Sequence, residues 1–205
     1  MITDSSFLSD NCPPMGIYET LYAFKDSFGK FMGESNTHPW SQGFPLTTPL
    51  DKFGGPPLPS SVDVTPQDRF YPKAWGHPLL RKAIVNYYNT HYGSKLAPEN
   101  VMVFAGGRPG IFAILAFLKK DVEVRISQAE WPAYLDILEQ TKTRYAVVPS
   151  TKKNKFHPAN SAFYDRTTLN AKTRIFPIIS NPGNPTGHAR YGDELKELIE
   201  MAEEK

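Results

Sequence analysis

The sequence has very little cysteine, no long apolar run and no large excess of either charge. A single cysteine, Cys12, excludes an internal disulfide framework and a zinc site built from several cysteines. The longest apolar run, from Ile111 to Leu118, is too short to cross a membrane. The first residues lack the basic start and apolar stretch of a secretory signal, so we expect a cytoplasmic location. Lys and Arg (23) barely outnumber Asp and Glu (21) and are scattered, which argues against a nucleic-acid partner.

Proline and apolar residues are plentiful instead. The chain has 205 residues, 40% of them hydrophobic, with 19 Pro and 14 Gly, which suffices for one domain or slightly more. Prolines and glycines gather between residues 36 and 66, a pattern typical of an extended loop. We therefore divide the chain into an N-terminal helix with a Pro/Gly-rich segment (1–66) and a larger domain (67–205). That first helix, over residues 17–32, is predicted from apolar residues at helical spacing: Ile17, Leu21, Phe24, Phe28 and Phe31.

A second helix is predicted directly after the Pro/Gly-rich segment. Pro78 suits the first helical position, and Gly93 suits the residue that ends a helix. The apolar residues between them share one side of the helix, which we expect to be buried: Leu80, Ala83, Ile84, Tyr87 and Tyr88.

From residue 101 onward, predicted strands and helices alternate. Strands are predicted at residues 101–105, 122–126, 144–148 and 174–180, and helices at 111–120, 132–140 and 193–205. This order predicts an α/β fold in which helices flank a mostly parallel sheet. Ligands of such sheets bind where strands end and helices begin. Because the sheet is small and the apolar side of the last helix lacks a strand to cover it, we expect the N-terminal part of a larger protein.

The first predicted strand runs into two glycines, an arginine and then a helix. Gly106 and Gly107 let backbone N–H groups approach an anion, and the start of a helix adds partial positive charge. Arg108 adds a full charge with a forked donor. These residues predict a phosphate-binding turn, and the alternative is a tight turn between strand and helix without a ligand.

The second distinctive turn is Asn-Pro-Gly-Asn-Pro-Thr-Gly, residues 181–187. Pro182 and Pro185 fix the backbone, and Asn181 and Asn184 tolerate turn geometry, so the loop is expected to be stiff. Such a loop can aim the Asn184 amide at a ligand oxygen. The alternative is a plain Asn/Pro turn between a strand and a helix.

With these motifs, the sequence resembles the class I/II aminotransferases of the pyridoxal-phosphate (PLP) type I fold. The Asn-Pro-Thr-Gly motif and the phosphate-binding turn carry most of the resemblance. Three further stretches agree in order and spacing: Gln42–Pro45, Tyr71–Arg81 and Glu130–Tyr134. The resemblance covers roughly residues 15–205 and implies that residues 67–205 are the N-terminal part of an incomplete PLP-binding large domain.

The resemblance also implies a role for individual residues in binding the cofactor, pyridoxal 5′-phosphate. Gly106, Gly107 and Arg108 would hold the phosphate, Trp131 would stack on the pyridine ring, and Asn184 would donate to the ring hydroxyl oxygen. For Trp131, a core or interface tryptophan is the alternative. Glu130 places a carboxylate beside that ring, and the resemblance gives it no role.

Three more expectations follow from the resemblance. Tyr71 would reach the phosphate of a partner subunit, which implies a homodimer, and the alternative is a buried loop tyrosine. Gly43 would lie near the substrate carboxylate. The peptide bond between Asn184 and Pro185 is expected to be cis, as it often is in the family.

The family's Schiff-base lysine, its aspartate at the pyridine nitrogen and its carboxylate-binding arginine all follow the Asn-Pro-Thr-Gly motif, and we expect them beyond Lys205. We therefore assign no catalytic residue and no metal site here and expect the chain alone to bind PLP weakly at best. The complete protein would transfer an amino group between an amino acid and a 2-oxo acid. Two alternatives stay open, a PLP-dependent lyase or cyclase on the same fold and a non-catalytic short or split-gene protein.

Overall fold

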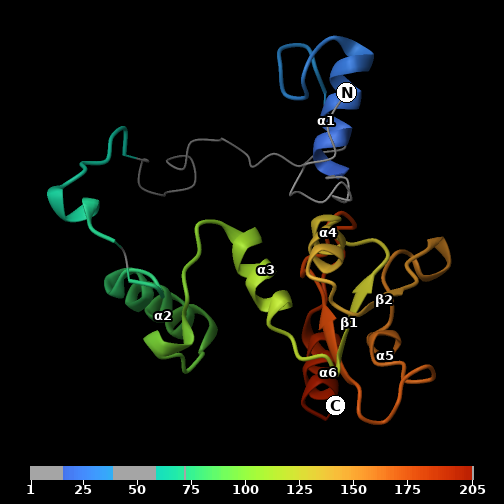
Figure 1. Cartoon of the computed structure of the whole chain (residues 1–205). Helices are drawn as coiled ribbons and strands as arrows, with labels where there is room; N and C mark the ends of the chain where they lie inside the picture. Colours follow the sequence, from blue (N-terminus) through green and yellow to red (C-terminus); the bar gives the residue numbers. More distant parts are fainter. Residues whose placement is uncertain (1–15, 39–58, 72, 205) are drawn as a thin grey trace, which may run out of the picture. The chain divides into compact units, whose positions relative to one another are not determined.

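The computed structural model describes residues 16–38, 59–71 and 73–204 (Figure 1). They fall into two compact units, which are described separately. The sheet unit joins Gly107–Lys205 to the start of the chain up to Ala23, and the α2 unit spans Phe24–Gly106. The division predicted at residue 66 stays a prediction. No helix in the described ranges is long and apolar enough to cross a membrane.

The sheet unit is built on three parallel strands: β1 (Val122–Ser127), β2 (Tyr145–Val148) and β3 (Arg174–Ile178). The strand order is β2-β1-β3, so β1 lies in the centre. Ile126 of β1 is opposite Val147 of β2 and Ile178 of β3, which fixes the register. The predicted α/β architecture with a parallel sheet and flanking helices is confirmed.

Two helices cover one face of this sheet. They are α3 (Gly107–Ala116) and α4 (Ala133–Gln140). Because side chains alternate along a strand, Val124 and Ile126 share this face of β1. They form a core with three residues of the two helices: Leu115, Ile137 and Leu138.

The opposite face is covered by α5 (Asn160–Phe163) and α6 (Gly192–Glu204). Its core is smaller and consists of Val148, Phe163 and Tyr164, against which Leu198 and Met201 of α6 pack. The apolar side of this last helix is therefore covered in part: Leu198 packs against the core, whereas Ile199 is 52% exposed.

This second face also buries charge. Glu123 and Arg125 of β1 are 5% and 8% exposed, and they form an ion pair of 2.8 Å. Arg144 contacts the other Glu123 oxygen at 2.6 Å. Removing one partner of such a buried pair leaves a charge without compensation, so the three residues depend on one another.

The first predicted strand is wrong. Residues 101–105 belong to no strand of the described sheet, and Met102 is 51% exposed. Val103 instead donates its N–H to the Trp75 carbonyl at 3.1 Å. A short apolar run shows that a segment favours burial, but only a hydrogen-bonded neighbour makes it a strand.

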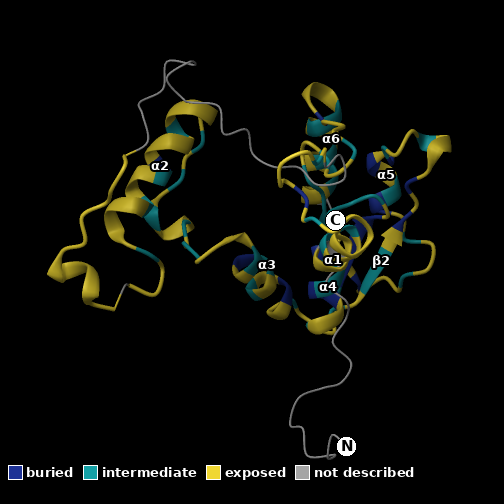
Figure 2. Ribbon diagram, turned by 90° about the horizontal axis from the view of Figure 1, so that it is seen from above, coloured by how far each residue is buried: buried dark blue, intermediate teal, exposed yellow. Residues whose placement is uncertain are grey.

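The main helix of the α2 unit is α2 (Pro78–Tyr92). Both predicted ends are confirmed, since Pro78 is the first helical residue and Gly93 ends the helix at φ +63°. Two single-turn helices, η2 (Pro66–Arg69) and η3 (Pro98–Asn100), flank it. The predicted buried side is wrong, because Leu80 is 47% exposed and only Val85 of this helix is buried (Figure 2).

The first helix, α1 (Gly16–Phe28), is shorter than the predicted span of 17–32. It ends where Gly29 turns to φ +70° and donates to the Lys25 carbonyl at 2.7 Å, a helix ending that glycine favours. η4 (Lys152–Asn154) lies between β2 and α5. Most of the Pro/Gly-rich segment lies outside the described residues.

Candidate functional site

The predicted phosphate-binding turn leads into α3. Gly106 has φ +105°, a conformation that side chains disfavour, and its N–H donates to the Phe104 carbonyl at 2.8 Å. A side-chain Cβ at Gly107 would meet no atom within 4 Å, so the space in front of this residue is open. The first amides of a helix have no intrahelical acceptor, and Pro109 has no N–H. The amides of Gly107 and Arg108 are therefore the free donors of this turn.

Arg108, at the start of α3, contacts the loop that follows β1. Its guanidinium carbon lies 5.1 Å from the centroid of the Trp131 ring, a cation–π contact. Trp131 is half-buried and packs edge-on against Tyr134 at 5.3 Å. Burial also raises the pKa of Asp136 on α4, although Arg108 opposes this shift. The positive charge of Arg108 thus contacts the Trp131 ring and acts on the Asp136 carboxyl group.

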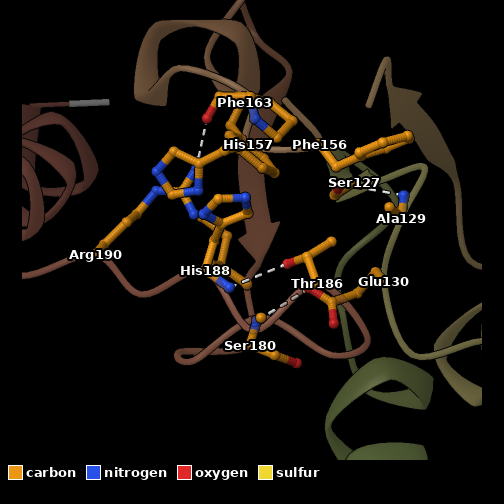
Figure 3. Close-up of a pocket in the computed structure, with 13 residues that line it drawn as sticks. Ser127, Ala129, Glu130, Phe156, His157, Phe163, Ser180, Thr186, His188 and Arg190 are labelled. Carbon is orange, nitrogen blue, oxygen red and sulfur yellow. Dashed lines mark hydrogen bonds between the residues drawn. The ribbon is translucent and has the colours of Figure 1, made fainter. Parts of the chain in front are cut away.

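Glu130 connects the Trp131 loop to the end of β3. One carboxylate oxygen accepts the Trp131 N–H at 3.0 Å, and the other accepts the Ser180 N–H at 3.1 Å (Figure 3). Ser180 directly precedes the Asn-Pro-Gly-Asn-Pro-Thr-Gly loop. One side chain therefore bonds to backbone on both loops at the carboxyl ends of β1 and β3.

The Asn-Pro-Gly-Asn-Pro-Thr-Gly loop is closed at its base by Asn181. The Asn181 side chain donates to the Arg190 carbonyl and accepts the Arg190 N–H, both at 2.8 Å. Inside the loop, Gly183 donates to the His188 carbonyl and accepts from Gly187, both at 2.7 Å. A Cβ at Gly183 would lie 2.6 Å from Thr186 Oγ1, so a larger residue here would force the Thr186 side chain to move. The loop is a stiff unit, in line with its prolines.

Asn184 lies in this loop with its side chain exposed. It forms no hydrogen bond to any residue that the structure describes, so its amide remains available to a ligand. The peptide bond between Asn184 and Pro185 is cis, which confirms the prediction. The bond between Asn181 and Pro182 is cis as well, and the sequence analysis did not anticipate it.

Arg190 anchors the loop on its other side. It is 6% exposed and donates Nε to Asn160 Oδ1 at 2.9 Å and another N–H to the Pro158 carbonyl. Burial lowers the pKa of Arg190, while the charges of Glu194 and Glu130 raise it. Glu194 also contacts His157 Nε2 at 2.6 Å, so α6 takes part in this anchor.

Between these anchors lies a small cavity of about 20 Å³, room for a water molecule rather than for a cofactor. Its lining is largely polar and includes Ser127, Glu130, His157, Ser180, His188 and Arg190 (Figure 3). A cofactor would therefore have to bind outside this cavity. No cluster of His, Cys, Asp and Glu suited to a metal ion occurs among the described residues.

The sheet unit thus connects three of the segments singled out from the sequence. Arg108 contacts Trp131, and Glu130 links Trp131 to the loop of Asn184. Tyr71 is fully exposed and, like Gly106, belongs to the α2 unit. Gly43 lies outside the described residues.

Two residues of this site were not assigned a role from the sequence. Glu130 was noted only as a carboxylate beside a ring, and Arg190 gave no signal at all. The partners of both are backbone atoms or residues distant in sequence, which no spacing rule reveals.

Proteins of known function resemble this chain over most of its described length. The chain is 29% identical over 130 residues to an aspartate aminotransferase of Pyrococcus horikoshii, covering 63% of this chain and 32% of that protein. It is also 29% identical over 161 residues to an LL-diaminopimelate aminotransferase of Dehalococcoides mccartyi, covering 73% and 41%. The matched part of the chain therefore spans about a third of one of these relatives and about two fifths of the other.

Solved structures agree on the fold. The aspartate aminotransferase of Thermus thermophilus with maleate matches with a TM-score of 0.58 at 24% identity, covering 66% of this chain and 35% of that one. An aromatic aminotransferase of Pyrococcus horikoshii gives 0.56 at 26% identity, covering 66% and 36%. The family model described as aminotransferase class I and II matches residues 61–205. Because that match takes in well over half of the sequence, the chain belongs to the class I and II aminotransferase family.

Proposed function

We propose that this chain forms part of the cofactor site of a PLP-dependent aminotransferase. The observation that carries the proposal is the pair of contacts made by Arg108 with Trp131 and by Glu130 with Ser180. Together they link a turn with free amides, an aromatic face and a stiff asparagine loop in one unit. These are the three kinds of group that a phosphorylated pyridine with a ring hydroxyl needs.

The donor set fits that cofactor. The amides of Gly107 and Arg108, with the Arg108 guanidinium, would bind the phosphate at the start of α3. The Trp131 ring offers a face to the pyridine, and the Asn184 amide has no other described partner and would donate to the ring oxygen. When bound, PLP supplies an electron sink that lets an amino group leave one carbon skeleton and join another.

This chain's own contribution is binding and orientation. Arg108 neutralises phosphate charge, and Asn184 orients the ring by one hydrogen bond at a defined oxygen. Trp131 excludes water from one ring face, which strengthens the polar contacts beside it. We assign no proton-transferring residue to this chain.

The activity of the whole protein is part of the proposal. It would move an amino group between an amino acid and a 2-oxo acid, as the names of its relatives suggest. Tyr71, exposed in the α2 unit, would reach the cofactor phosphate of a second subunit in a homodimer. Gly43 near the substrate carboxylate and a cytoplasmic location stay predictions. Lyase or cyclase chemistry on this fold has no observation in its favour here.

Ligand binding to the full chain tests the proposed site. We would titrate it with pyridoxamine 5′-phosphate, which has no aldehyde and so cannot react with surface lysines. Calorimetry should give one site, and Asn184→Ala should weaken binding about tenfold, the value of a hydrogen bond of about 1.4 kcal/mol. Arg108→Ala should weaken pyridoxamine 5′-phosphate binding at least as much, because it removes a charge from the phosphate.

Two controls separate the site from general surface binding. Pyridoxamine without its phosphate should bind far more weakly, and Arg108→Ala should not change its affinity. Asn170→Ala removes an asparagine from another loop of the sheet unit and should leave binding of the phosphate form unchanged. If the wild-type chain binds the two pyridoxamines equally, the phosphate role of this turn is wrong.

A further inference from the structure

We propose that Glu130 is a positioning residue that sets the separation between Trp131 and the loop of Asn184. The proposal rests on the proposed function, since it concerns how this site is held for its ligand. It assigns a role to a carboxylate for which neither the sequence nor the resemblance gave one.

The geometry of the Glu130 carboxylate is that of a bridge between two backbone segments. Its two oxygens accept one N–H each, from Trp131 at 3.0 Å and from Ser180 at 3.1 Å. Figure 3 shows the bond to Ser180. The two donors are 49 positions apart in the sequence and follow different strands. A charged acceptor makes these bonds stronger than bonds between neutral groups.

The bridge matters because the loop beyond Ser180 is internally stiff. Asn181 closes its base through two hydrogen bonds to Arg190, and Gly183 bonds to His188 and Gly187. A stiff loop moves as one piece, so a hydrogen bond at its base sets where its tip lies. Glu130 therefore controls the position of Asn184 without contacting it.

The loop has a second attachment that does not involve Trp131. Arg190 binds Asn160 and the Pro158 carbonyl, which holds the loop to the side of α5. Arg190 thus fixes the loop against α5, whereas Glu130 fixes it against Trp131. Loss of Glu130 should leave the loop folded but change its separation from the ring.

A buried arginine lies close to the Glu130 bridge. Glu130 and Arg190 line the same small cavity. Glu130 is only half-buried and belongs to neither apolar core. A substitution here is therefore expected to spare the fold, which makes it a usable test.

Three variants of Glu130 distinguish the effect of side-chain length from the effect of its charge. Glu130→Asp keeps the charge but is one methylene shorter, so it should keep the bond to the adjacent Trp131 amide and lose the bond to Ser180. Glu130→Gln keeps the length and one acceptor oxygen, so it should retain the Ser180 bond. Glu130→Ala loses both. The matched control is Glu139→Gln, which alters a carboxylate on α4 that binds the Tyr145 hydroxyl away from the site.

The first measurement is amide hydrogen exchange in the full chain without ligand. We expect the Ser180 amide to exchange about tenfold faster in the Asp and Ala variants, and clearly less so in the Gln variant. The Trp131 amide should keep its protection in the Asp variant and lose it in the Ala and Gln variants, because the single oxygen of the introduced Gln side chain is used by Ser180 and its NH2 group cannot accept a hydrogen bond. Equal Ser180 exchange in wild type and the Ala variant would overturn the bridge, whether or not any ligand binds.

The second measurement is calorimetric titration with pyridoxamine 5′-phosphate and with inorganic phosphate. Affinity for the former should fall about tenfold in the Asp and Ala variants and about threefold in the Gln variant. Affinity for inorganic phosphate, which needs only the turn at Gly107 and Arg108, should not change. A purely electrostatic role predicts the opposite order, with Asp behaving as wild type and Gln as Ala, and would overturn the positioning role.

The two measurements can contradict the cofactor site and the role of Glu130 independently of each other. If Ser180 exchange responds as expected but the wild-type chain binds no pyridoxamine 5′-phosphate, the proposed cofactor site is wrong, and with it the ligand-positioning role of Glu130. If wild type binds and all three variants bind equally well, the site stands and the role of Glu130 is wrong.

Discussion

The sheet unit and the α2 unit have similar patterns of apolar residues, but their apolar side chains are buried to very different extents. Val124 and Ile126 of β1 are completely buried, whereas Leu80 and Tyr87 of α2 are 47% and 53% exposed (Figure 2). Leu80 and Tyr87 were assigned to a buried side from their spacing. Spacing shows which side chains share a side of an element, but a second layer must cover that side before they are buried.

The two units also differ in what holds them together. In the sheet unit, parallel strands and two helical layers enclose β1. In the α2 unit, polar side chains bind backbone carbonyls: Arg81 donates to Val101 and Pro98, and Asn89 donates to Leu96. Shortening a buried apolar side chain should therefore lower the stability of the sheet unit more than that of the α2 unit. In the α2 unit, substitutions that change the backbone conformation should lower stability more than the loss of apolar side chains.

The largest expected effect is Leu138→Ala in the sheet unit. Leu138 is completely buried between α4 and the sheet, so truncation should cost about 2–5 kcal/mol of unfolding free energy. Urea unfolding followed by Trp131 fluorescence, with Trp40 and Trp75 replaced by Phe, would measure it. The matched control, Leu80→Ala on α2, should cost less than about 1 kcal/mol. Equal losses would show that the two units are equally well packed.

A smaller effect is expected from Gly76→Ala in the α2 unit. Gly76 has φ +100°, and an added Cβ would lie 2.7 Å from the Cβ of Val103, the residue bonded to the Trp75 carbonyl. Strain and displacement should cost about 1–3 kcal/mol, measured by urea unfolding through Trp75 fluorescence.

The matched control for that change is Gly93→Ala at the end of α2. Its φ is +63° and no atom lies within 4 Å of the added Cβ, so only backbone strain of about 1 kcal/mol is expected. If both substitutions cost the same, the contact with Val103 contributes nothing to this unit.

The smallest expected effect is that of a surface ion pair in the sheet unit. Arg174 lowers the pKa of Asp121 through a two-point contact of 3.0 Å, and both side chains are about half exposed. A lowered pKa in the folded state means that the pair stabilises above pH 3.8 and loses this effect as the pH falls through the folded-state pKa. Asp121→Asn should lower stability slightly at pH 7.

That difference should shrink at pH 3 and in high salt, because protonation and screening both weaken the wild-type pair. Urea unfolding of both proteins at the two pH values would measure it. A difference that grows on acidification would contradict the direction of the Asp121 pKa shift.

Much of the fold was predictable from local signals. The ends of α2 were predicted from Pro78 and Gly93, whose backbone preferences need no tertiary partner. Strands β1, β2 and β3 were predicted to within a residue or two because each is short, contains several β-branched or aromatic residues and lies between turns. Residues 101–105 carry the same local signal without a strand beside them, and the prediction was wrong there.

The candidate site also combines features that the sequence predicted with contacts that it did not predict. The stiffness of the Asn-Pro-Gly-Asn-Pro-Thr-Gly loop was expected from its prolines, and the cis bond at Pro185 was expected from the family resemblance. The contact of Arg108 with Trp131 and the bridge from Glu130 to Ser180 join segments 23 and 50 positions apart. No local rule predicts such pairs.

The sequence by itself determined the class of fold, the order of its elements and the chemical character of each turn. Those properties depend on backbone preferences and on the spacing of apolar residues along a few neighbouring positions. Only the tertiary structure decided which apolar sides are covered and which side chains from distant loops meet. Burial and hydrogen bonding are properties of pairs of segments, and their free energy is gained only when both partners are brought together.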